Sequence, residues 1–276
     1  TQHLYVRTDV LKANGIAIPK TYEEVVAASE KIRAAGKMKY PYAAAYKAGW
    51  NLAEEFVNMY IGHGGEFFEA GSAKPSINNA KGVATLNMLK KLADLSNPDY
   101  LTHDSEAIKV EWEAGNVAIM TLWASRSGTL LDDEGDAKIT AATKLVAPAT
   151  VGGGNIPAAT LWWDGFTLAK NRPDADAEAS FRAMAHAASS KEMVAKASDQ
   201  AVWLVEGFVP GPKSVGVIEA VKMGAKPYPM LPQMGLMHGA LGNEIVEFLQ
   251  GNETAEQALK DVEAAYNTKA KEQGFL

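Results

Sequence analysis

Residues 4–26 read LYVRTDVLKANGIAIPKTYEEVV, and this stretch decides how the fold is interpreted. Its first residues, Leu4–Val6, are apolar and β-favouring, which predicts a short strand. A brief helical turn is expected over Asp9–Ala13, and Gly15 is expected to end it. A second helix is expected to follow, so the stretch predicts a strand that leads into a helix.

The start of that second helix is marked by a capping signal. Thr21 can accept a hydrogen bond from the backbone N–H of Glu24, and the Glu24 side chain can reach back toward the N-cap. Pro19 disfavours helix ahead of the cap, so the position at which the helix begins is well defined. Taken alone, the stretch is a strand-to-helix entry with a capping box.

The composition is that of an ordinary globular protein. The chain has 276 residues, of which 47% are hydrophobic and 22% are charged, enough for two compact units or one large α/β domain. The net charge is −6 and the basic residues are dispersed, so nucleic-acid binding is not expected. The sequence has no apolar run of about 18 residues, so no membrane span is expected.

The chain contains no cysteine, which excludes disulfides, thiolate nucleophiles and cysteine-based zinc sites. This fits an oxidising periplasm, although cysteine-free cytosolic proteins also exist. No two of the five histidines have the spacing of a helical His-x-x-x-His metal site. We therefore expect no metal site and no cofactor.

Helical and strand patterns alternate along the chain, which predicts an α/β protein rich in helix. Helices are expected over 22–35, 51–60, 79–95, 105–114, 176–188, 191–199, 234–250 and 255–273. Strands are expected over 39–45, 117–122, 139–146 and 160–168. Thr254 and Gln257 repeat the spacing of a capping box at the last helix.

Five motifs appear in the order found in one known family. They are the opening stretch, EAGNVAIM at 113–120, WDGFTLAKNRPDA at 163–175, GFVPGPKSV at 207–215 and GNETAEQAL at 251–259. In this order the chain resembles the family 1 extracellular solute-binding proteins, which are maltose-binding-protein-like and capture sugars for ABC importers. The opening stretch then corresponds to the crossover from one lobe to the other.

The resemblance implies a fold like that of type II periplasmic binding proteins, with one nearly complete helix-rich lobe and part of the other. Residues 8–164 and 216–276 would form lobe two, the C-terminal lobe. Residues 1–7 would be a hinge strand, and 165–215 a remnant of lobe one. Because relatives carry most of the first lobe's sheet ahead of the hinge strand, we expect a fragment, or a sheet supplied by another segment.

Binding a sugar from water requires flat aromatic faces and a few fixed polar groups. Trp50 opens a predicted helix, where many relatives place an aromatic residue against the ligand, although a surface-to-core anchor is equally consistent. Trp123 follows a buried strand, where open α/β sheets bind their ligands. Arg126 could donate to a ligand or pair with a surface acid.

Trp162 and Trp163 are adjacent in a predicted strand and should point to opposite faces, with Trp163 expected in the cleft. Asp164 could accept hydroxyl hydrogen bonds or be a solvated strand end. It stands where many relatives carry a tryptophan, which favours a small, hydroxyl-rich ligand. His238 falls where relatives place an aromatic residue beside the cleft, although a lone histidine is more often structural.

The resemblance implies a receptor that closes two lobes on a sugar or polyol and delivers it to a membrane permease. Such a receptor is periplasmic or lipid-anchored and extracellular, and it has no catalytic residues. An α/β carbohydrate-active enzyme is the alternative, and it would need two convergent carboxylates. A fragment unable to bind is a further alternative.

Overall fold

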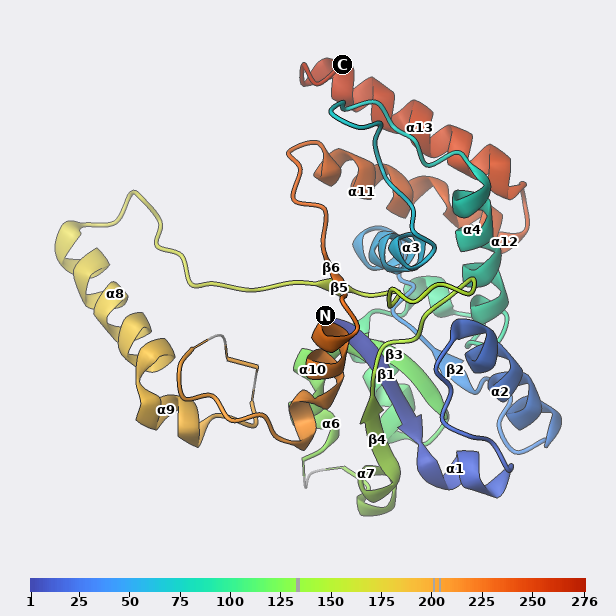
Figure 1. Cartoon of the computed structure of the whole chain (residues 1–276), viewed down its shortest axis with the longest axis horizontal. Coiled ribbons are helices and arrows are strands. Elements are labelled where there is room, and N and C mark those ends of the chain that lie inside the picture. The colour runs from blue at the N-terminus through green and yellow to red at the C-terminus, as the bar shows by residue number, and fades with distance from the viewer. Residues whose placement is uncertain (133–134, 201, 204) are drawn as a thin grey trace.

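The computed structural model describes residues 1–132, 135–200, 202–203 and 205–276, and it is an α/β fold rich in helix. A four-stranded sheet has the order β2-β3-β1-β4, with β1 (Gln2–Arg7), β2 (Tyr42–Ala43), β3 (Ile119–Trp123) and β4 (Thr143–Val146). β1 is antiparallel to both β3 and β4, and β2 runs parallel to β3 (Figure 1). The predicted opening strand is therefore a central strand of the sheet.

Helices cover the sheet and build most of the molecule (Figure 1). In chain order they are α1 (Thr8–Ala13), α2 (Tyr22–Ala34), α3 (Trp50–Gly62), α4 (Ala80–Ala93), α5 (Ser105–Glu113), α6 (Ser127–Leu130), α7 (Ala137–Ala142), α8 (Asp174–Ser189), α9 (Lys191–Lys196), α10 (Val215–Lys222), α11 (Met234–Glu244), α12 (Val246–Gln250) and α13 (Ala255–Glu272). Short 3-10 turns lie at Tyr100–Thr102, Ala124–Arg126 and Pro212–Ser214, and β5 (Thr160–Leu161) pairs with β6 (Lys226–Pro227).

The capping box predicted at the start of α2 is confirmed. The backbone N–H of Glu24 donates to Thr21 Oγ1 over 3.1 Å, and the backbone N–H of Thr21 donates to Glu24 Oε2 over 3.3 Å. The backbone N–H of Tyr22 donates to the Thr150 carbonyl over 2.8 Å, which ties the helix start to the segment after β4. The capping box and the long-range hydrogen bond of Tyr22 therefore both fix the start of α2.

The core lies on both faces of the sheet. Leu4 and Val6 of β1 face the larger cluster, which α2, α3, α4, α11 and α13 complete. Tyr5 faces the opposite way and contacts Trp112 of α5. This alternation follows from the two-residue repeat of a strand. Trp112 is fully buried in the smaller core cluster, and its Nε1–H donates to Thr143 Oγ1 over 3.1 Å.

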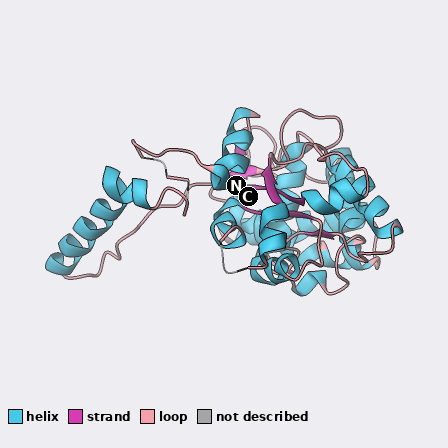
Figure 2. Cartoon of the chain, turned by 90° about the horizontal axis from the view of Figure 1, so that it is seen from below, coloured by secondary structure: helices cyan, strands magenta, loops and turns pink. Residues whose placement is uncertain are grey.

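The described residues between 165 and 211 form an arm that leaves the rest of the chain. Figures 1 and 2 show α8 and α9 standing away from the sheet, joined to it by extended segments. α8 buries none of its side chains, and Phe181 is 59% exposed. At the return of the arm, the Ser127 hydroxyl donates to the Lys213 carbonyl over 2.9 Å. The division of the chain into two lobes remains a prediction.

Two predicted strands are wrong in their extent. Asp136 accepts from the backbone N–H groups of Lys138 and Ile139, and this cap makes residues 137–142 a helix, so that only 143–146 remain strand. The strand expected over 160–168 ends at Leu161. Its partner β6 is short and ends in a proline, which cannot donate to a ladder, so residues beyond Leu161 have no strand to pair with.

Three further expectations are corrected in detail. The strand predicted over 39–45 is reduced to Tyr42–Ala43. The helix predicted over 234–250 is two helices that meet at Ile245. At α13, Thr254 accepts from the backbone of Gln257, but the Gln257 side chain donates to Asp261 over 2.8 Å, so only half of the capping box forms.

A first prediction concerns the Thr21 cap. We expect Thr21→Ala to lower the free energy of unfolding by about 1 kcal/mol, because the N–H of Glu24 loses its acceptor. Thr21→Ser keeps the hydroxyl and should stay near the wild-type value. Urea denaturation of both variants measures the difference, and equal stability of the alanine and serine variants would contradict the role of the cap.

A second prediction concerns the crossing of α3 and α11. The backbone N–H of Gly49 donates to the Gly242 carbonyl over 2.9 Å, and a Cβ atom at Gly242 would lie 2.2 Å from the Gly49 carbonyl oxygen. We expect Gly242→Ala to destabilise the protein by about 1–3 kcal/mol, because the helices must separate.

Gly239 is the matched control for this crossing. It lies one turn earlier in α11, and a Cβ atom there would meet nothing within 4 Å. Gly239→Ala should raise stability by about 0.5–1 kcal/mol, since alanine is the better helix former. Opposite signs for the two substitutions in urea denaturation support the close approach, whereas a stabilising Gly242→Ala excludes it.

Candidate functional site

Five aromatic rings from distant parts of the chain form one contiguous group, which we call the aromatic cluster. Its members are Trp50, Trp123, Trp162, Tyr228 and His238. The ring centroid of Trp50 lies 5.0 Å from that of His238, 5.9 Å from that of Trp162 and 6.0 Å from that of Trp123. Trp162 and Tyr228 are 4.4 Å apart. Trp50 is therefore the central ring.

Four of the five rings lie at or near the end of a structural element, and His238 lies within α11. Trp50 is the first residue of α3, and Gly49 before it has a φ of 93°, a conformation that favours glycine. Trp123 ends β3, Trp162 follows β5 and Tyr228 follows β6. Strand ends and helix starts meet at one edge of the sheet, which is where α/β folds place their ligands.

His238 joins the two sides of the cluster through its ring nitrogens. Nε2 lies 3.0 Å from the Trp50 carbonyl oxygen, and Nδ1 lies 2.9 Å from the Tyr228 hydroxyl oxygen. Burial lowers the pKa of His238. In the neutral ring, Nε2–H donates to the carbonyl and Nδ1 accepts from the tyrosine hydroxyl, so both nitrogens are satisfied.

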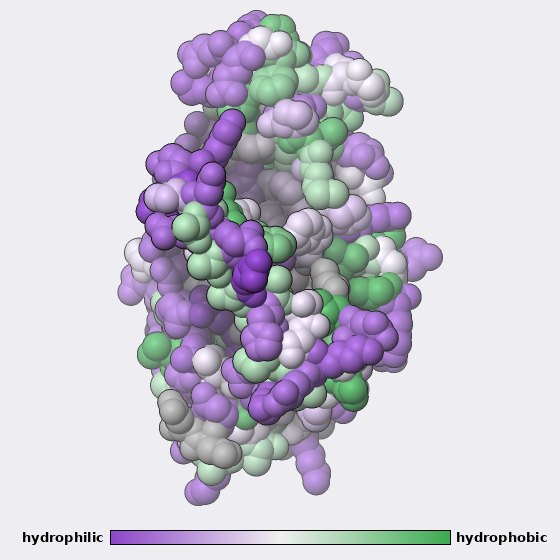
Figure 3. All heavy atoms as spheres, turned by 90° about the vertical axis from the view of Figure 1, so that its left-hand side faces the viewer, coloured by the Kyte–Doolittle hydropathy of each residue, from purple (hydrophilic) through white to green (hydrophobic). Residues whose placement is uncertain are grey.

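The cluster is only partly covered. Trp50 keeps 49% of its surface exposed although three rings contact it, and Trp162 keeps 37%. Viewed from the side of the arm, polar and apolar side chains surround a hollow in the molecular surface (Figure 3). An exposed aromatic face beside hydrogen-bonding groups is an arrangement that binds ring compounds with both apolar and hydroxyl surfaces.

The structure brings Trp50, Trp123 and His238 of the expected residues together. It places Trp163 outside the cluster, 70% exposed and folded against Gly165. Trp162 takes the inner position instead. Trp162 and Trp163 were expected to point to opposite faces because both were assigned to one strand. That strand ends at Leu161, so its alternation of faces does not extend to them.

The remaining expected residues lie at the surface. Asp164 is exposed beside Trp163. Arg126 forms an ion pair with Glu106, and its side chain keeps 37% of its surface exposed. This matches the alternative that Arg126 pairs with a surface acid. Tyr228 was not singled out from the sequence, because it lies in a proline-rich stretch with no periodic pattern.

Buried polar side chains lie directly beneath the cluster. Trp162 Nε1 lies 3.1 Å from Glu54 Oε1 and 2.9 Å from Thr160 Oγ1. Glu54 and its neighbour Glu55 are 0% and 4% exposed. Burial raises the pKa of Glu54 to about 7 and that of Glu55 to about 8.

The positions of these two acids in the sequence indicate that they are buried, which the overall composition does not show. Glu54 lies four residues after Trp50, so both side chains point to the same side of α3. The rest of that helix is largely apolar and buried, and charged residues are rarely buried unless they have partners. Two adjacent acids in an apolar helix therefore indicate a buried polar site.

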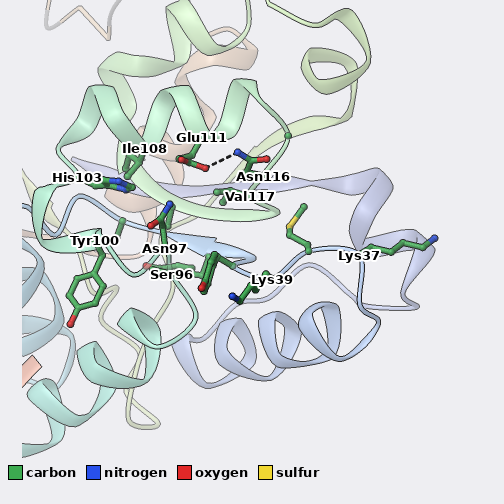
Figure 4. A pocket seen from close by; sticks show the side chains of 16 residues that line it. Lys37, Lys39, Ser96, Asn97, Tyr100, His103, Ile108, Glu111, Asn116 and Val117 are labelled. Atoms are coloured by element: carbon green, nitrogen blue, oxygen red, sulfur yellow. Dashed lines mark hydrogen bonds between the residues drawn. The ribbon is translucent and has the colours of Figure 1, made fainter. Parts of the chain in front are cut away.

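A separate cavity of about 290 Å³ lies away from the cluster, between the end of α2, the edge of β2 and α5. Its lining includes Lys39, Asn97, His103 and Glu111, and Glu111 accepts from the Asn116 amide over 2.9 Å (Figure 4). Basic, acidic and neutral groups are mixed there, so the lining favours no single class of ligand. None of the expected site residues lines it.

Two features are absent from residues 1–132, 135–200, 202–203 and 205–276. No three histidine, aspartate or glutamate side chains gather in a way that could hold a metal ion. No helix combines the length and apolar character that a membrane crossing requires.

Three solved structures with the same fold are remote from this chain in sequence. Maltose-bound MalE3 of T. maritima superposes with a TM-score of 0.80 at 18% identity, over 97% of this chain and 70% of that one. A solute-binding protein of Agrobacterium vitis with bound D-mannitol gives 0.80 at 17% identity, over 99% and 71%. One from Agrobacterium radiobacter in complex with ribitol gives 0.78 at 18% identity, over 97% and 69%.

A curated relative from Sinorhizobium fredii is named a probable amino-acid ABC transporter periplasmic-binding protein. It is 30% identical over 128 residues, which is 45% of this chain and 29% of the relative. The match thus spans less than a third of that protein's length. Residues 1–194 match the sequence profile of the family described as bacterial extracellular solute-binding proteins. Since this match covers more than half of the chain and the fold agrees, the chain belongs to the family of bacterial extracellular solute-binding proteins.

Proposed function

We propose that the chain serves as solute receptor of an ABC importer and captures a sugar or polyol at the aromatic cluster. The observation that supports this most directly is the partly exposed face of Trp50, held by three other rings at the edge of the sheet. A tryptophan face covers the C–H patches of a sugar or polyol, and nearby polar groups replace the water on its hydroxyls. Neither a cofactor nor a catalytic residue takes part.

The proposed receptor has two lobes. Residues 8–164 and 216–276 form one lobe, residues 1–7 a hinge strand, and residues 165–215 belong to the other lobe. The arm supports this division, because α8 buries no side chain against the rest of the chain and Phe166 is 66% exposed. Ligand that touches both lobes favours the closed form, which is the form that docks on the permease.

The proposed ligand is small and rich in hydroxyl groups. D-mannitol and ribitol, bound by two proteins of the same fold, belong to that class. Asp164 is exposed two residues after Trp162 of the cluster and is proposed to accept hydroxyl hydrogen bonds from the ligand. Trp163 and Arg126 complete the proposed site as residues of its rim. The proposed location is the periplasm, or the outer surface through a lipid anchor.

A third prediction tests the ligand site. Isothermal titration of the full-length protein with D-mannitol, ribitol and maltose should find at least one ligand with a micromolar or tighter Kd. Trp50→Ala should weaken that binding by about tenfold or more, which corresponds to about 1.4 kcal/mol. No binding of any sugar or polyol would overturn the proposal.

Trp163→Ala is the matched comparison, since it removes a tryptophan that contacts no other ring in the described structure. We expect a change of less than about threefold, because the sugar stacks on the cluster. A loss equal to that of Trp50→Ala would move the centre of the site to the segment after β5. Hydrolysis of simple glycosides by the same preparation would instead favour the carbohydrate-active enzyme.

A further inference from the structure

Among the polar side chains beneath the aromatic cluster, the Thr160 hydroxyl has two close oxygen neighbours but only one hydrogen to donate. Thr160 Oγ1 lies 2.8 Å from Glu54 Oε1 and 2.7 Å from Asn58 Oδ1. A threonine hydroxyl has a single hydrogen to donate, so it can donate to only one of these oxygens. The other contact requires a hydrogen from elsewhere.

The orientation of Asn58 decides which contact Thr160 makes as a donor. Asn58 Nδ2–H donates to Gln2 Oε1 over 3.2 Å, and Gln2 Nε2–H donates to Glu55 Oε1 over 2.9 Å. With its amide nitrogen turned to Gln2, Asn58 presents its oxygen to Thr160. The Thr160 hydroxyl therefore donates to Asn58, and the missing hydrogen lies between Thr160 and Glu54.

A proton on Glu54 Oε1 completes the set. Glu54 then donates to Thr160, Thr160 to Asn58, Asn58 to Gln2 and Gln2 to Glu55, in one continuous direction. We propose that Glu54 is a positioning residue that acts in its protonated form, donating to Thr160 while it accepts from Trp162 and so holds that ring in the aromatic cluster. The proposal rests on the proposed function, since it takes the cluster to be the ligand site.

The surroundings of Glu54 favour the neutral form. Its other oxygen, Oε2, is buried and has no partner, which is tolerable for a carbonyl oxygen but unfavourable for a carboxylate. Burial also raises the pKa of Glu54 to about 7, which puts its loss of the proton near neutral pH. Glu55 stands next to it on α3 as the acceptor at the far end of the chain of bonds.

Other titratable groups face Glu54 from several elements. Tyr228 beside β6 has its pKa raised by burial and by Glu54. His238 of α11 is reached only through Tyr228 and Trp50, and burial lowers its pKa.

Loss of the Glu54 proton changes what Trp162 contacts. The carboxylate and the Asn58 oxygen then compete for the one hydrogen of Thr160, and the chain of bonds to Glu55 is broken. Trp162 Nε1–H is shared between the two atoms that change, Glu54 Oε1 and Thr160 Oγ1. Its indole N–H is therefore a direct reporter of the protonation of Glu54.

The fourth prediction uses that reporter. In ¹⁵N–¹H spectra of the full-length protein without ligand, the indole signal lost in Trp162→Phe identifies Trp162. We expect this signal to move with pH, with a midpoint near 7. Trp112, whose Nε1–H donates to the Thr143 hydroxyl, is the internal control and should not move.

Variants of Glu54 and Glu55 test whether Glu54 positions the Trp162 ring or is needed only for folding. Glu54→Gln has no titratable group, and its amide N–H can donate to Thr160 but cannot accept from Trp162, so the Trp162 signal should hold one position at every pH through its bond to Thr160. Glu54→Leu cannot donate or accept, and should shift the signal away from that position. Glu55→Gln keeps the acceptor for Gln2, and the titration of Trp162 should persist. A Trp162 signal that is independent of pH in the wild type, or that titrates equally in Glu54→Gln, overturns the proposal.

Ligand-binding measurements distinguish the proposed positioning role of Glu54 from the proposed receptor function. With D-mannitol, ribitol and maltose as probes, Glu54→Leu should weaken any observed binding by about tenfold, and Glu54→Gln, which still donates to Thr160, should weaken it less. In Trp162→Phe, which has no indole N–H, Glu54→Leu should have no further effect. Equal affinity of Glu54→Leu and the wild type refutes positioning while the receptor function stands. Titration of Trp162 without binding of any probe refutes the receptor function while positioning stands.

Discussion

The close crossing of α3 and α11 is the contact on which the rest of the site depends. Gly49 and Gly242 meet backbone to backbone, so the first residue of α3 lies directly against α11. This crossing places Trp50 beside His238, and the ring of His238 contacts both the Trp50 carbonyl and the Tyr228 hydroxyl. Two glycines without side chains thus bring together rings that lie 188 residues apart in the chain.

Beneath the rings, the same helix presents two acidic side chains to the protein interior. Glu54 and Glu55 are buried on α3, where an unpartnered carboxylate would be strongly unfavourable. Their partners come from β1 through Gln2 and from β5 through Thr160. The polar contacts therefore connect β1 with β5, the strand after which the arm begins. A change in that connection reaches the aromatic cluster through Trp162.

Sequence reasoning succeeded where local chemistry decides structure. The capping box at Thr21 and the buried strand near Val117 are both specified by neighbouring residues. Trp50 and Trp123 could be expected near one another, because helix starts and strand ends converge at one edge of an α/β sheet, and His238 was expected beside the cleft from the family resemblance. Reasoning from periodicity went wrong after Leu161, because a strand needs a partner and β6 is too short to supply one.

The sequence by itself determined the alternation of helices and strands, the capping box at Thr21 and the membership in a family of solute-binding proteins. These follow from contacts between neighbouring residues and from motif order, which a linear pattern records. Only the tertiary structure decided that Trp162 rather than Trp163 joins the cluster, that Tyr228 belongs to it and that Glu54 lies beneath it. Those facts depend on pairings across long stretches of chain, such as that of β5 with β6, whose residues lie 66 apart (226 − 160) and which no local pattern encodes.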